Sequence, residues 1–504
     1  MIAPETVMVI ALLAPFVGAA IIPVYWRRPD MREAVTLIAA AVLFLATLGL
    51  AGPVLAGARP ALHLLDVAPG ISVAFAIEPL GMLFALIASG LWILTSVYAI
   101  GYMRGNDEPR QTGFYLCFAI ALGSTIGVAF SANLFTLFLF YEALTISTYP
   151  LVTHRRDEES LRAGRVYLLL LIGSSTVLLL PAIIGTWSLA GTLDFTAGGI
   201  LAGKAGPVAV TVLLLMFVFG IGKAAVMPLH WWLPAAMVAP TPVSALLHAV
   251  AVVKTGVFCI VKVAVLIFGI DLLAATGQAS WLTAVAGATV LAASLVALRQ
   301  DNLKRRLAYS TVSQLSYIVL GVAILAPVSL VGAAMHIAAH AVSKITLFFA
   351  AGSIYTAAHL TEVSELDGIG RRMPWTMTAF TIGALGMIGL PPTAGFLGKW
   401  FILTGAMQTA NWLAVGVIIL STMLNAGYFL PVVYRAFFLP TPQADHHHGH
   451  SHGRERGHGH GHDHGIREAP WPIVLALSLT AAATLGLFFW PDGVLALATL
   501  MLGR

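Results

Sequence analysis

Six charged side chains lie inside long apolar stretches of the sequence. They are five lysines and one glutamate: Lys223, Lys254, Lys262, Lys344, Lys399 and Glu142. A charge at mid-membrane costs about 2.5–3.5 kcal/mol, so five lysines facing lipid would cost roughly as much as the whole stability of a domain. Burial favours the neutral form of a lysine, whereas a nearby carboxylate favours the ammonium. Such side chains suit proton transfer, and we expect them to face a shared hydrated interior.

Histidines accompany two of these lysines at short spacing. His248 precedes Lys254 by six residues, and the segment HIAAHAVSK places His336, His340 and Lys344 four residues apart in turn. Residues spaced by four share one face of a helix. Two histidines at this spacing could bind a metal, but a lysine comes next on the face and no carboxylate joins it. The pattern therefore favours a polar stripe of titratable groups.

Prolines interrupt two of the apolar stretches close to a lysine. Lys223 is followed by Pro228, and Lys399 is preceded by Pro391 and Pro392. An unwound turn in a membrane is tolerated only against protein or a water-filled cavity. Matching interruptions in two halves of a chain indicate an internal repeat with a transport path at the midplane. We therefore predict that Lys223 lines a proton path beside a helix break.

The composition indicates the elements that position these groups. Of the 504 residues, 59% are hydrophobic and 10% are charged, whereas soluble domains carry about 25% charged residues. Apolar runs near 20 residues recur along the chain, long enough to cross a bilayer as helices. The first run has an acidic residue before it and no clear cleavage site, so it is not a convincing signal peptide. Two cysteines in apolar runs exclude a disulfide framework, a zinc finger and an Fe–S cluster.

The sequence predicts an all-α polytopic membrane protein with about 14 transmembrane helices. The predicted spans centre on 5–25, 34–55, 79–102, 112–130, 133–153, 164–188, 207–229, 243–268, 279–298, 307–326, 329–357, 375–406, 411–438 and 471–500. The seventh and the twelfth are the spans that the prolines interrupt.

The distribution of basic residues predicts the orientation. Loops after odd-numbered spans hold nineteen lysines and arginines, whereas loops after even-numbered spans hold only Arg59 and Lys204. Because cytoplasmic loops carry the excess of basic residues, the odd loops should be cytoplasmic. Both termini are then expected outside, and the protein should lie in the cell (inner or plasma) membrane.

Several segments resemble one known family. They are NLFTLFLFYEALTISTYPLV, FGIGKAAVMPLHWWLPAAMVAPTPVSALLHAVAVVKTGVF, DNLKRRLAYSTVSQLSYIVLG, HIAAHAVSKITLFFAAGSI and GLPPTAGFLGKWFIL. The sequence is similar to the antiporter-like subunits shared by Mrp-type Na⁺/H⁺ antiporters and respiratory complex I. The resemblance implies two inverted five-helix repeats, spans 4–8 and 9–13, each with a proton half-channel and a broken helix. The predicted division of the chain is N-terminal helices (1–110), two repeats (111–270 and 271–440), a His-rich loop (441–470) and a C-terminal helix (471–504). Nothing in the family pattern calls for the His-rich loop.

The resemblance also implies roles for the buried charges. Glu142 corresponds to the carboxylate that pairs with the lysine of span seven, here Lys223. The matching relay positions in spans eight, eleven and twelve are Lys254 with His248, Lys344 with His340, and Lys399. His336 is added to the candidate residues because it shares the helix face of His340 and Lys344. Lys262 stands where many members have arginine, and snorkelling to the surface is an equally good interpretation for it.

The length and the segment GFLGKWF are most similar to the D-type member of the Mrp antiporters. The implied function is a proton-translocating subunit of a multisubunit monovalent cation/proton antiporter, with H⁺ and Na⁺ as the ions. Other hydrophobic subunits and the lipid membrane would be its partners, with no cofactor and no nucleic acid. The alternative is a proton-pumping subunit of a complex I-type NADH:quinone oxidoreductase or a membrane-bound hydrogenase.

A histidine-rich tract, ADHHHGHSHGRERGHGHGHDHG, lies in the last predicted cytoplasmic loop. Its histidines are His446, His447, His448, His450, His452, His458, His460, His462 and His464. Weak metal binding or pH sensing is one interpretation, and a tolerated loop insertion is the one we favour. A metal-ion transporter would need carboxylates and histidines clustered within its spans, and one carboxylate among several lysines argues against it. No motif of a soluble enzyme is visible, so we expect part of a transporter and not an enzyme.

Overall fold

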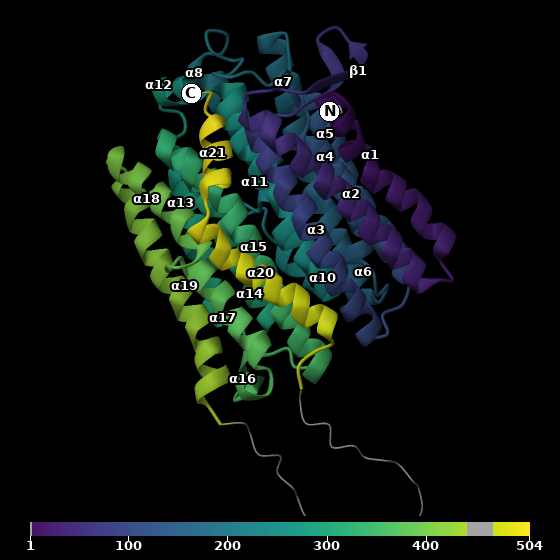
Figure 1. Cartoon of the computed structure of the whole chain (residues 1–504). Helices are drawn as coiled ribbons and strands as arrows, with labels where there is room; N and C mark the ends of the chain where they lie inside the picture. The colour runs from purple at the N-terminus through teal and green to yellow at the C-terminus, as the bar shows by residue number, and fades with distance from the viewer. Residues whose placement is uncertain (1–2, 441–466, 504) are drawn as a thin grey trace, which may run out of the picture.

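The computed structural model describes residues 3–440 and 467–503, and these are mostly helical (Figure 1). The elements of the N-terminal half are α1 (Pro4–Ile21), α2 (Pro29–Leu55), β1 (Ala61–Ala68), β2 (Ile71–Ala76), α3 (Pro79–Gly105), α4 (Gln111–Ala129), α5 (Leu134–Val152), α6 (Glu158–Ser174), α7 (Leu180–Ala190), α8 (Pro207–Gly220), α9 (Trp232–Ala235), α10 (Thr241–Ala245), α11 (Val252–Val263) and α12 (Ile270–Thr276). The prediction of a helical polytopic protein is confirmed.

The second half contains α13 (Ser280–Arg299), α14 (Leu303–Ala323), α15 (Pro327–Ala358), α16 (Ile369–Arg372), α17 (Pro374–Ile388), α18 (Ala394–Gln408), α19 (Trp412–Phe438), α20 (Trp471–Phe489) and α21 (Asp492–Leu500). Short 3₁₀ turns lie at Ile22–Tyr25, Gly222–Ala224, Ala236–Val238 and Val363–Glu365, and π-helical turns lie at Ser175–Leu179, Leu246–Val250 and Ala264–Phe268. The π turns were not predicted, because one extra residue in a helical turn leaves no trace in the hydrophobic pattern.

Eleven helical segments of the described residues are long and apolar enough to cross a membrane. They correspond to eleven of the predicted spans. The other three predicted spans correspond to α8, which is shorter, to α14, and to the interrupted pair α17 and α18. The total of fourteen spans and their arrangement as two inverted repeats remain predictions.

A β-hairpin joins α2 to α3, and it is an exception to the expected all-helical chain. Its strands β1 and β2 pair antiparallel, with Ala61 opposite Ala76 and Ala68 opposite Ile71. Gly70, at φ +72°, makes the turn between them, a conformation that favours glycine. In Figure 1 the hairpin lies at the same end of the bundle as both labelled chain ends, and α16 lies at the opposite end.

Both predicted helix breaks are present. The helix α8 ends at Gly220 and regular helix returns only at Trp232, with Pro228 in the gap. The helix α17 ends at Ile388, and α18 begins at Ala394 after Pro391 and Pro392. Proline removes a backbone donor and clashes with the preceding turn, so neither helix can continue through these positions.

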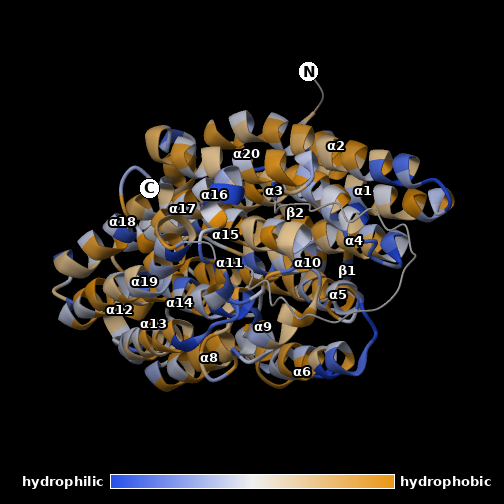
Figure 2. Ribbon diagram, turned by 90° about the horizontal axis from the view of Figure 1, so that it is seen from below, coloured by the Kyte–Doolittle hydropathy of each residue, from blue (hydrophilic) through white to orange (hydrophobic). Residues whose placement is uncertain are grey.

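Two helical segments form the centre of the molecule. In Thr241–Phe268, which contains α10 and α11, and in α15, 94% of the residues of the most apolar stretch are buried, compared with 39% in α1 and α2. Figure 2, seen from below, places α15 and α11 inside the ring of other helices. These central segments carry His248, Lys254, His336, His340 and Lys344, so the expected interior position of the polar stripe is observed.

Candidate proton-translocation site

Lys223 lies in the first helix break and is completely buried. Its ammonium donates to the carbonyl oxygen of Tyr141 at 2.8 Å and to Oγ1 of Thr145 at 2.6 Å. It also lies 3.1 Å from the centroid of the Tyr141 ring. Hydrogen bonds and a ring face therefore replace the water that an ammonium loses on burial.

The chain around this break is held by specific partners. The backbone N–H of Lys223 donates to the hydroxyl of Tyr141 at 3.2 Å, and Nε1 of Trp232 donates to the carbonyl oxygen of Gly222 at 3.0 Å. A Cβ atom on Gly256 of α11 would lie 2.2 Å from the backbone nitrogen of Ala224. Glycine at this position therefore lets α11 pack directly against the unwound segment.

The predicted contact between Glu142 and Lys223 is not formed in this structure. Glu142 is half-buried, its Oε1 has no hydrogen-bond partner, and no basic group of the described residues lies within 4 Å of its carboxylate. The two residues come from adjacent elements, but the ammonium turns to Tyr141 and Thr145 instead. The resemblance implied this pairing, whereas the packing of α5 decides which oxygen atoms the ammonium reaches.

Lys254 and His340 form the junction between the two halves. Nζ of Lys254 is hydrogen bonded to Nδ1 of His340, and both side chains are fully buried. The ring of His336 lies 6.2 Å from that of His340, and its Nε2 is hydrogen bonded to Oε1 of Gln314 at 3.0 Å. Nδ1 of His336 and Nε2 of His340 have no hydrogen-bond partner among the described residues. No third His, Cys, Asp or Glu side chain of the described residues joins the pair, so the metal-binding alternative has no support in the geometry.

His248 lies in the π turn that precedes α11 and is fully buried. Neither ring nitrogen has a hydrogen-bond partner among the residues described, and the ring packs 4.8 Å from that of Phe348. Burying an imidazole whose ring nitrogens have no hydrogen-bond partner is costly, unless water or an incoming proton binds to those nitrogens. This is the behaviour expected of a side chain beside a hydrated path.

Lys344 and Lys399 are buried with neutral oxygen partners. Nζ of Lys344 donates to Oγ of Ser310 at 2.5 Å and to the carbonyl oxygen of Leu307 at 3.3 Å. Nζ of Lys399 donates to the carbonyl oxygens of Met387 and Ile388, at 2.8 and 3.0 Å. These two carbonyls are left free where α17 ends, and the C-terminus of a helix attracts cations.

Several uncharged partners of the site were not predicted. They are Tyr141, Thr145, Ser310, Gln314 and Tyr317, whose ring lies 4.6 Å from Nζ of Lys399. Hydroxyl and amide side chains occur in many membrane helices, so their types alone carry little signal. A clue was present in STVSQ of α14, where four of five consecutive residues are polar.

Lys262 does not snorkel to the surface. Its side chain is fully buried and its Nζ lies 3.3 Å from Oε2 of Glu78. The ammonium also donates to the carbonyl oxygen of Ser131 at 2.7 Å. Lys262 therefore belongs to a separate ion pair near the hairpin.

The histidines of the tract 446–464, for which weak metal binding was the less favoured interpretation, lie outside the described residues. Within residues 3–440 and 467–503, no group of three or more His, Cys, Asp or Glu side chains could hold a metal ion.

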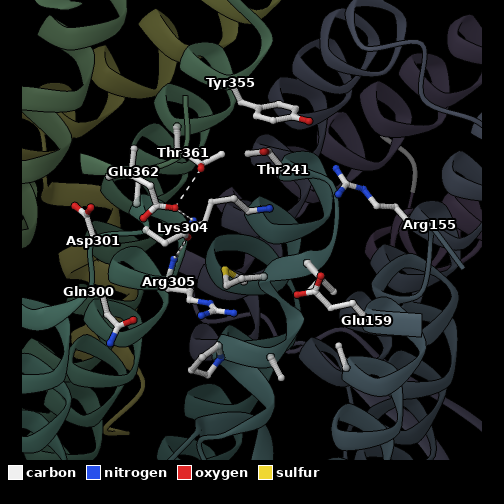
Figure 3. Close-up of a pocket in the computed structure, with 18 of the residues that line it drawn as sticks. Arg155, Glu159, Thr241, Gln300, Asp301, Lys304, Arg305, Tyr355, Thr361 and Glu362 are labelled. Atoms are coloured by element: carbon white, nitrogen blue, oxygen red, sulfur yellow. Dashed lines mark hydrogen bonds between the residues drawn. The ribbon is translucent and has the colours of Figure 1, made fainter. Parts of the chain in front are cut away.

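A cavity of about 800 Å³ opens at the face of the bundle that carries the basic loops (Figure 3). Arg155 and Glu159 line one side, and Asp301, Lys304 and Glu362 line the other. Thr241, the first residue of α10, also lines it, and the same segment continues to His248 and Lys254. The cavity therefore ends at the helix that carries the central titratable groups.

Lys304, which lines this cavity, has an unusually low pKa for a lysine. It precedes the predicted span 307–326, and its Nζ donates to the carbonyl oxygen of Ala239 at 2.6 Å. Burial, and to a smaller extent the charge of Arg155, lower the pKa of Lys304 to about 7, while Glu108 opposes the shift. The ammonium therefore predominates below pH 7 and the neutral amine above it.

Comparison with known proteins identifies the family. Residues 131–425 match the protein family described as NADH:quinone oxidoreductase/Mrp antiporter, TM. NADH-quinone oxidoreductase subunit N of Desulforudis audaxviator (strain MP104C) is 32% identical over 86% of this chain and 87% of its own length. The A/B component of a probable K(+)/H(+) antiporter from Rhizobium meliloti (strain 1021) is 31% identical over 88% of this chain, which spans only 44% of that longer protein.

The fold has a close counterpart among solved structures. A chain of the Mrp complex from Dietzia sp. DQ12-45-1b superposes with a TM-score of 0.85 and 22% sequence identity, covering 100% of this chain and 97% of that one. The family match covers more than half of the sequence and includes Glu142, Lys223, Lys254 and Lys399. The chain therefore belongs to the NADH:quinone oxidoreductase/Mrp antiporter transmembrane family.

Proposed function

We propose that this chain is a proton-translocating subunit of a multisubunit monovalent cation/proton antiporter. The observation that carries the proposal is the set of buried titratable side chains along the centre of the molecule, from Lys223 through Lys254 and His340 to Lys399. None of these four side chains has a carboxylate within ion-pair distance among the described residues. Such groups are retained in a membrane where they carry protons or ions.

The proposed path has a defined order of residues. Protons pass between Lys223, Lys254, His340 and Lys344 and reach the far side near Lys399. Each step moves one proton from an ammonium or imidazolium to a neighbouring neutral amine or imidazole. Closing of the Glu142–Lys223 contact would hold a proton on Lys223, and the open arrangement seen here would let it leave. The helix breaks at Pro228 and Pro391–Pro392 and the two repeats, 111–270 and 271–440, belong to this proposal.

Glu142 indicates that another hydrophobic protein covers part of the surface. Leu139 and Ile146 lie three residues before and four residues after it on α5, and they are 42% and 64% exposed. Residues at this spacing share one face, so the partly exposed Glu142 borders the outward face of α5 in the middle of a span, although its Oε1 is itself buried. A carboxylate against lipid is costly, which supports contact with another hydrophobic subunit of the same complex.

The proposed location is the plasma membrane, with both termini outside and the cavity of Figure 3 open to the cytoplasm. The excess of basic residues in the loops on the cavity side supports this orientation. Na⁺ as the coupled ion, and a place equivalent to the D-type member of the Mrp antiporters, complete the proposal.

A proton-pumping subunit of a redox complex is the second candidate. The observation that favours it is the 32% identity to a protein named NADH-quinone oxidoreductase subunit N, over most of both chains. The proton path would then be the same, and an electron-transfer partner would supply the energy.

Purification of the native complex distinguishes the two candidates. We expect gentle detergent extraction, followed by mass spectrometry, to recover this chain with other small hydrophobic antiporter subunits. Fe–S, flavin or hydrogenase subunits in the same particle would contradict the antiporter proposal and establish the redox alternative.

Lys304 should give transport a pH dependence near neutrality. Because its pKa is about 7, the cavity gains a positive charge as the pH falls from 8 to 6. One charge at a partly buried site changes the energy of a nearby proton by about 1 kcal/mol, a factor of roughly five. We expect Lys304→Arg, whose guanidinium stays charged, to remove the change in rate between pH 6 and 8. Initial rates in vesicles measure this, and an unchanged inflection near pH 7 would contradict it.

A further inference from the structure

Lys262 is held differently from the other four intramembrane lysines. It is the only one of the five with a carboxylate oxygen within 4 Å among the described residues, that of Glu78 at 3.3 Å. The lysine is completely buried, whereas the Glu78 side chain is 18% exposed. The Lys262–Glu78 ion pair therefore lies between the interior of the protein and the surface, on the face that carries the hairpin.

The ion pair lies beneath a cap made of several chain segments. The hairpin is tied to the link between α4 and α5 by two backbone hydrogen bonds, from Ala76 to the oxygen of Phe130 at 2.7 Å and from Ala132 to the oxygen of Ala74 at 3.0 Å. Ser131 lies between these bonds, and its carbonyl oxygen accepts from Nζ of Lys262. One ammonium thus joins α11 to the hairpin region and to the start of α3.

The segment after α7 completes the cap. The backbone N–H of Phe195 donates to the oxygen of Ala132 at 3.0 Å, and the ring centroid of Phe195 lies 4.1 Å from Nζ of Lys262. Further along, Ile200 donates to the oxygen of Ile267 at 2.9 Å. A Cβ atom on Gly269 would lie 2.0 Å from the oxygen of Gly198, so the segment lies directly on the residue that follows the π turn after α11. We call Glu78, Ser131, Phe195 and Lys262 the outer seal.

Lys262 of the outer seal lies on α11, and the same helix also contacts the first helix break. Gly256 of α11 touches the backbone at Lys223 and Ala224, Cys259 follows one turn later, and Lys262 follows after another. Cys259 is completely buried. Along α11, less than two turns of helix separate the break from the outer seal.

We propose that the Lys262–Glu78 ion pair closes the first half of the proton path toward the hairpin face. Lys262 is then a positioning residue that keeps the cap in place, and it does not pass protons itself. This rests on the proposed function, because a seal is needed only where a path has to be closed. The carboxylate of Glu78 and the carbonyl oxygen of Ser131 hold the Lys262 ammonium in one position between the hairpin region and α11.

Proton leak and thiol labelling of Cys259 test this in the assembled complex. In vesicles without a cation gradient, we expect Lys262→Ala to increase the passive proton leak. An impermeant methanethiosulfonate reagent, added on the hairpin side, should label Cys259 at least about tenfold faster in this variant, because local opening governs access to a buried group. Labelling is read by mass spectrometry of the Cys259 peptide.

Two further variants separate sealing from loss of structure. Lys262→Arg keeps the positive charge and should retain the low leak and the slow labelling. Lys262→Ala combined with Lys223→Ala should label quickly but leak no more than the wild type, because the leaking protons need Lys223. If the complex with Lys262→Ala does not assemble, Glu78→Gln can replace it in the leak and labelling measurements. This substitution removes the negative charge of the partner with almost no change of shape.

The outcomes distinguish this proposal from the proposed function. Rapid labelling without a leak would support the seal and contradict the proton path. An assembled Lys262→Ala complex with unchanged leak and unchanged labelling would overturn the seal. Loss of transport in that complex, again without leak or labelling, would also overturn it, because it would make Lys262 a member of the relay.

Discussion

Replacement of Lys223 by alanine is expected to abolish proton-coupled transport in an assembled complex. Lys223 is the titratable group at the first helix break, and its ammonium is held by the carbonyl oxygen of Tyr141 and the hydroxyl of Thr145. Without it, a proton would have to cross the break without a carrier. We expect the transport rate to fall by about a hundredfold or more, which corresponds to a barrier raised by several kcal/mol.

The stability of the complex should change much less than its activity. The substitution removes both hydrogen bonds of the ammonium, but the carbonyl oxygen of Tyr141 still accepts from Oγ1 of Thr145 at 3.3 Å. The expected loss of stability is therefore about 1–3 kcal/mol. Lys204→Ala is the matched control, because Lys204 lies in a loop and its ammonium donates to a carbonyl oxygen, that of Ala190. Cation-driven pH changes in vesicles, normalised to the amount of assembled complex, provide the measurement. Wild-type rates for Lys223→Ala would rule out the proposed path.

The second large effect is expected at the junction of the two halves. Lys254 and His340 are hydrogen bonded to each other and are the direct link between α11 and α15 in the proposed path. We expect Lys254→Ala and His340→Ala each to reduce transport by at least about tenfold. The double variant should be no slower than the slower single variant, because both changes interrupt the same step.

The transport rates of the wild type, the two single variants and the double variant together form a double-mutant cycle. Independent contributions would multiply the two losses, and such a result would place Lys254 and His340 on separate paths. His359→Ala is the control, because His359 is exposed and follows the last turn of the same helix α15. A transport loss in that control of the size expected for His340→Ala would show that the effect is not specific to the junction.

The sequence by itself determined the membrane class, the position of most helices and which charged side chains lie in the interior. Charged side chains in apolar runs are so costly that their positions alone indicated an interior stripe. Proline cannot continue a helix, so both breaks were predictable from Pro228 and from Pro391 and Pro392. These conclusions depend on local chemistry and on spacing along one helix, which a sequence displays directly.

Only the tertiary structure decided which groups touch. Glu142 and Lys223 lie in adjacent elements, yet the ammonium turns to neutral oxygens, because the rotation of α5 about its axis is set by packing and not by local sequence. Lys262 and Glu78 are far apart in the chain and form an ion pair beneath a hairpin that no span pattern indicated. Contacts between distant segments depend on how helices and links pack in three dimensions, and one-dimensional periodicity carries no information about their register.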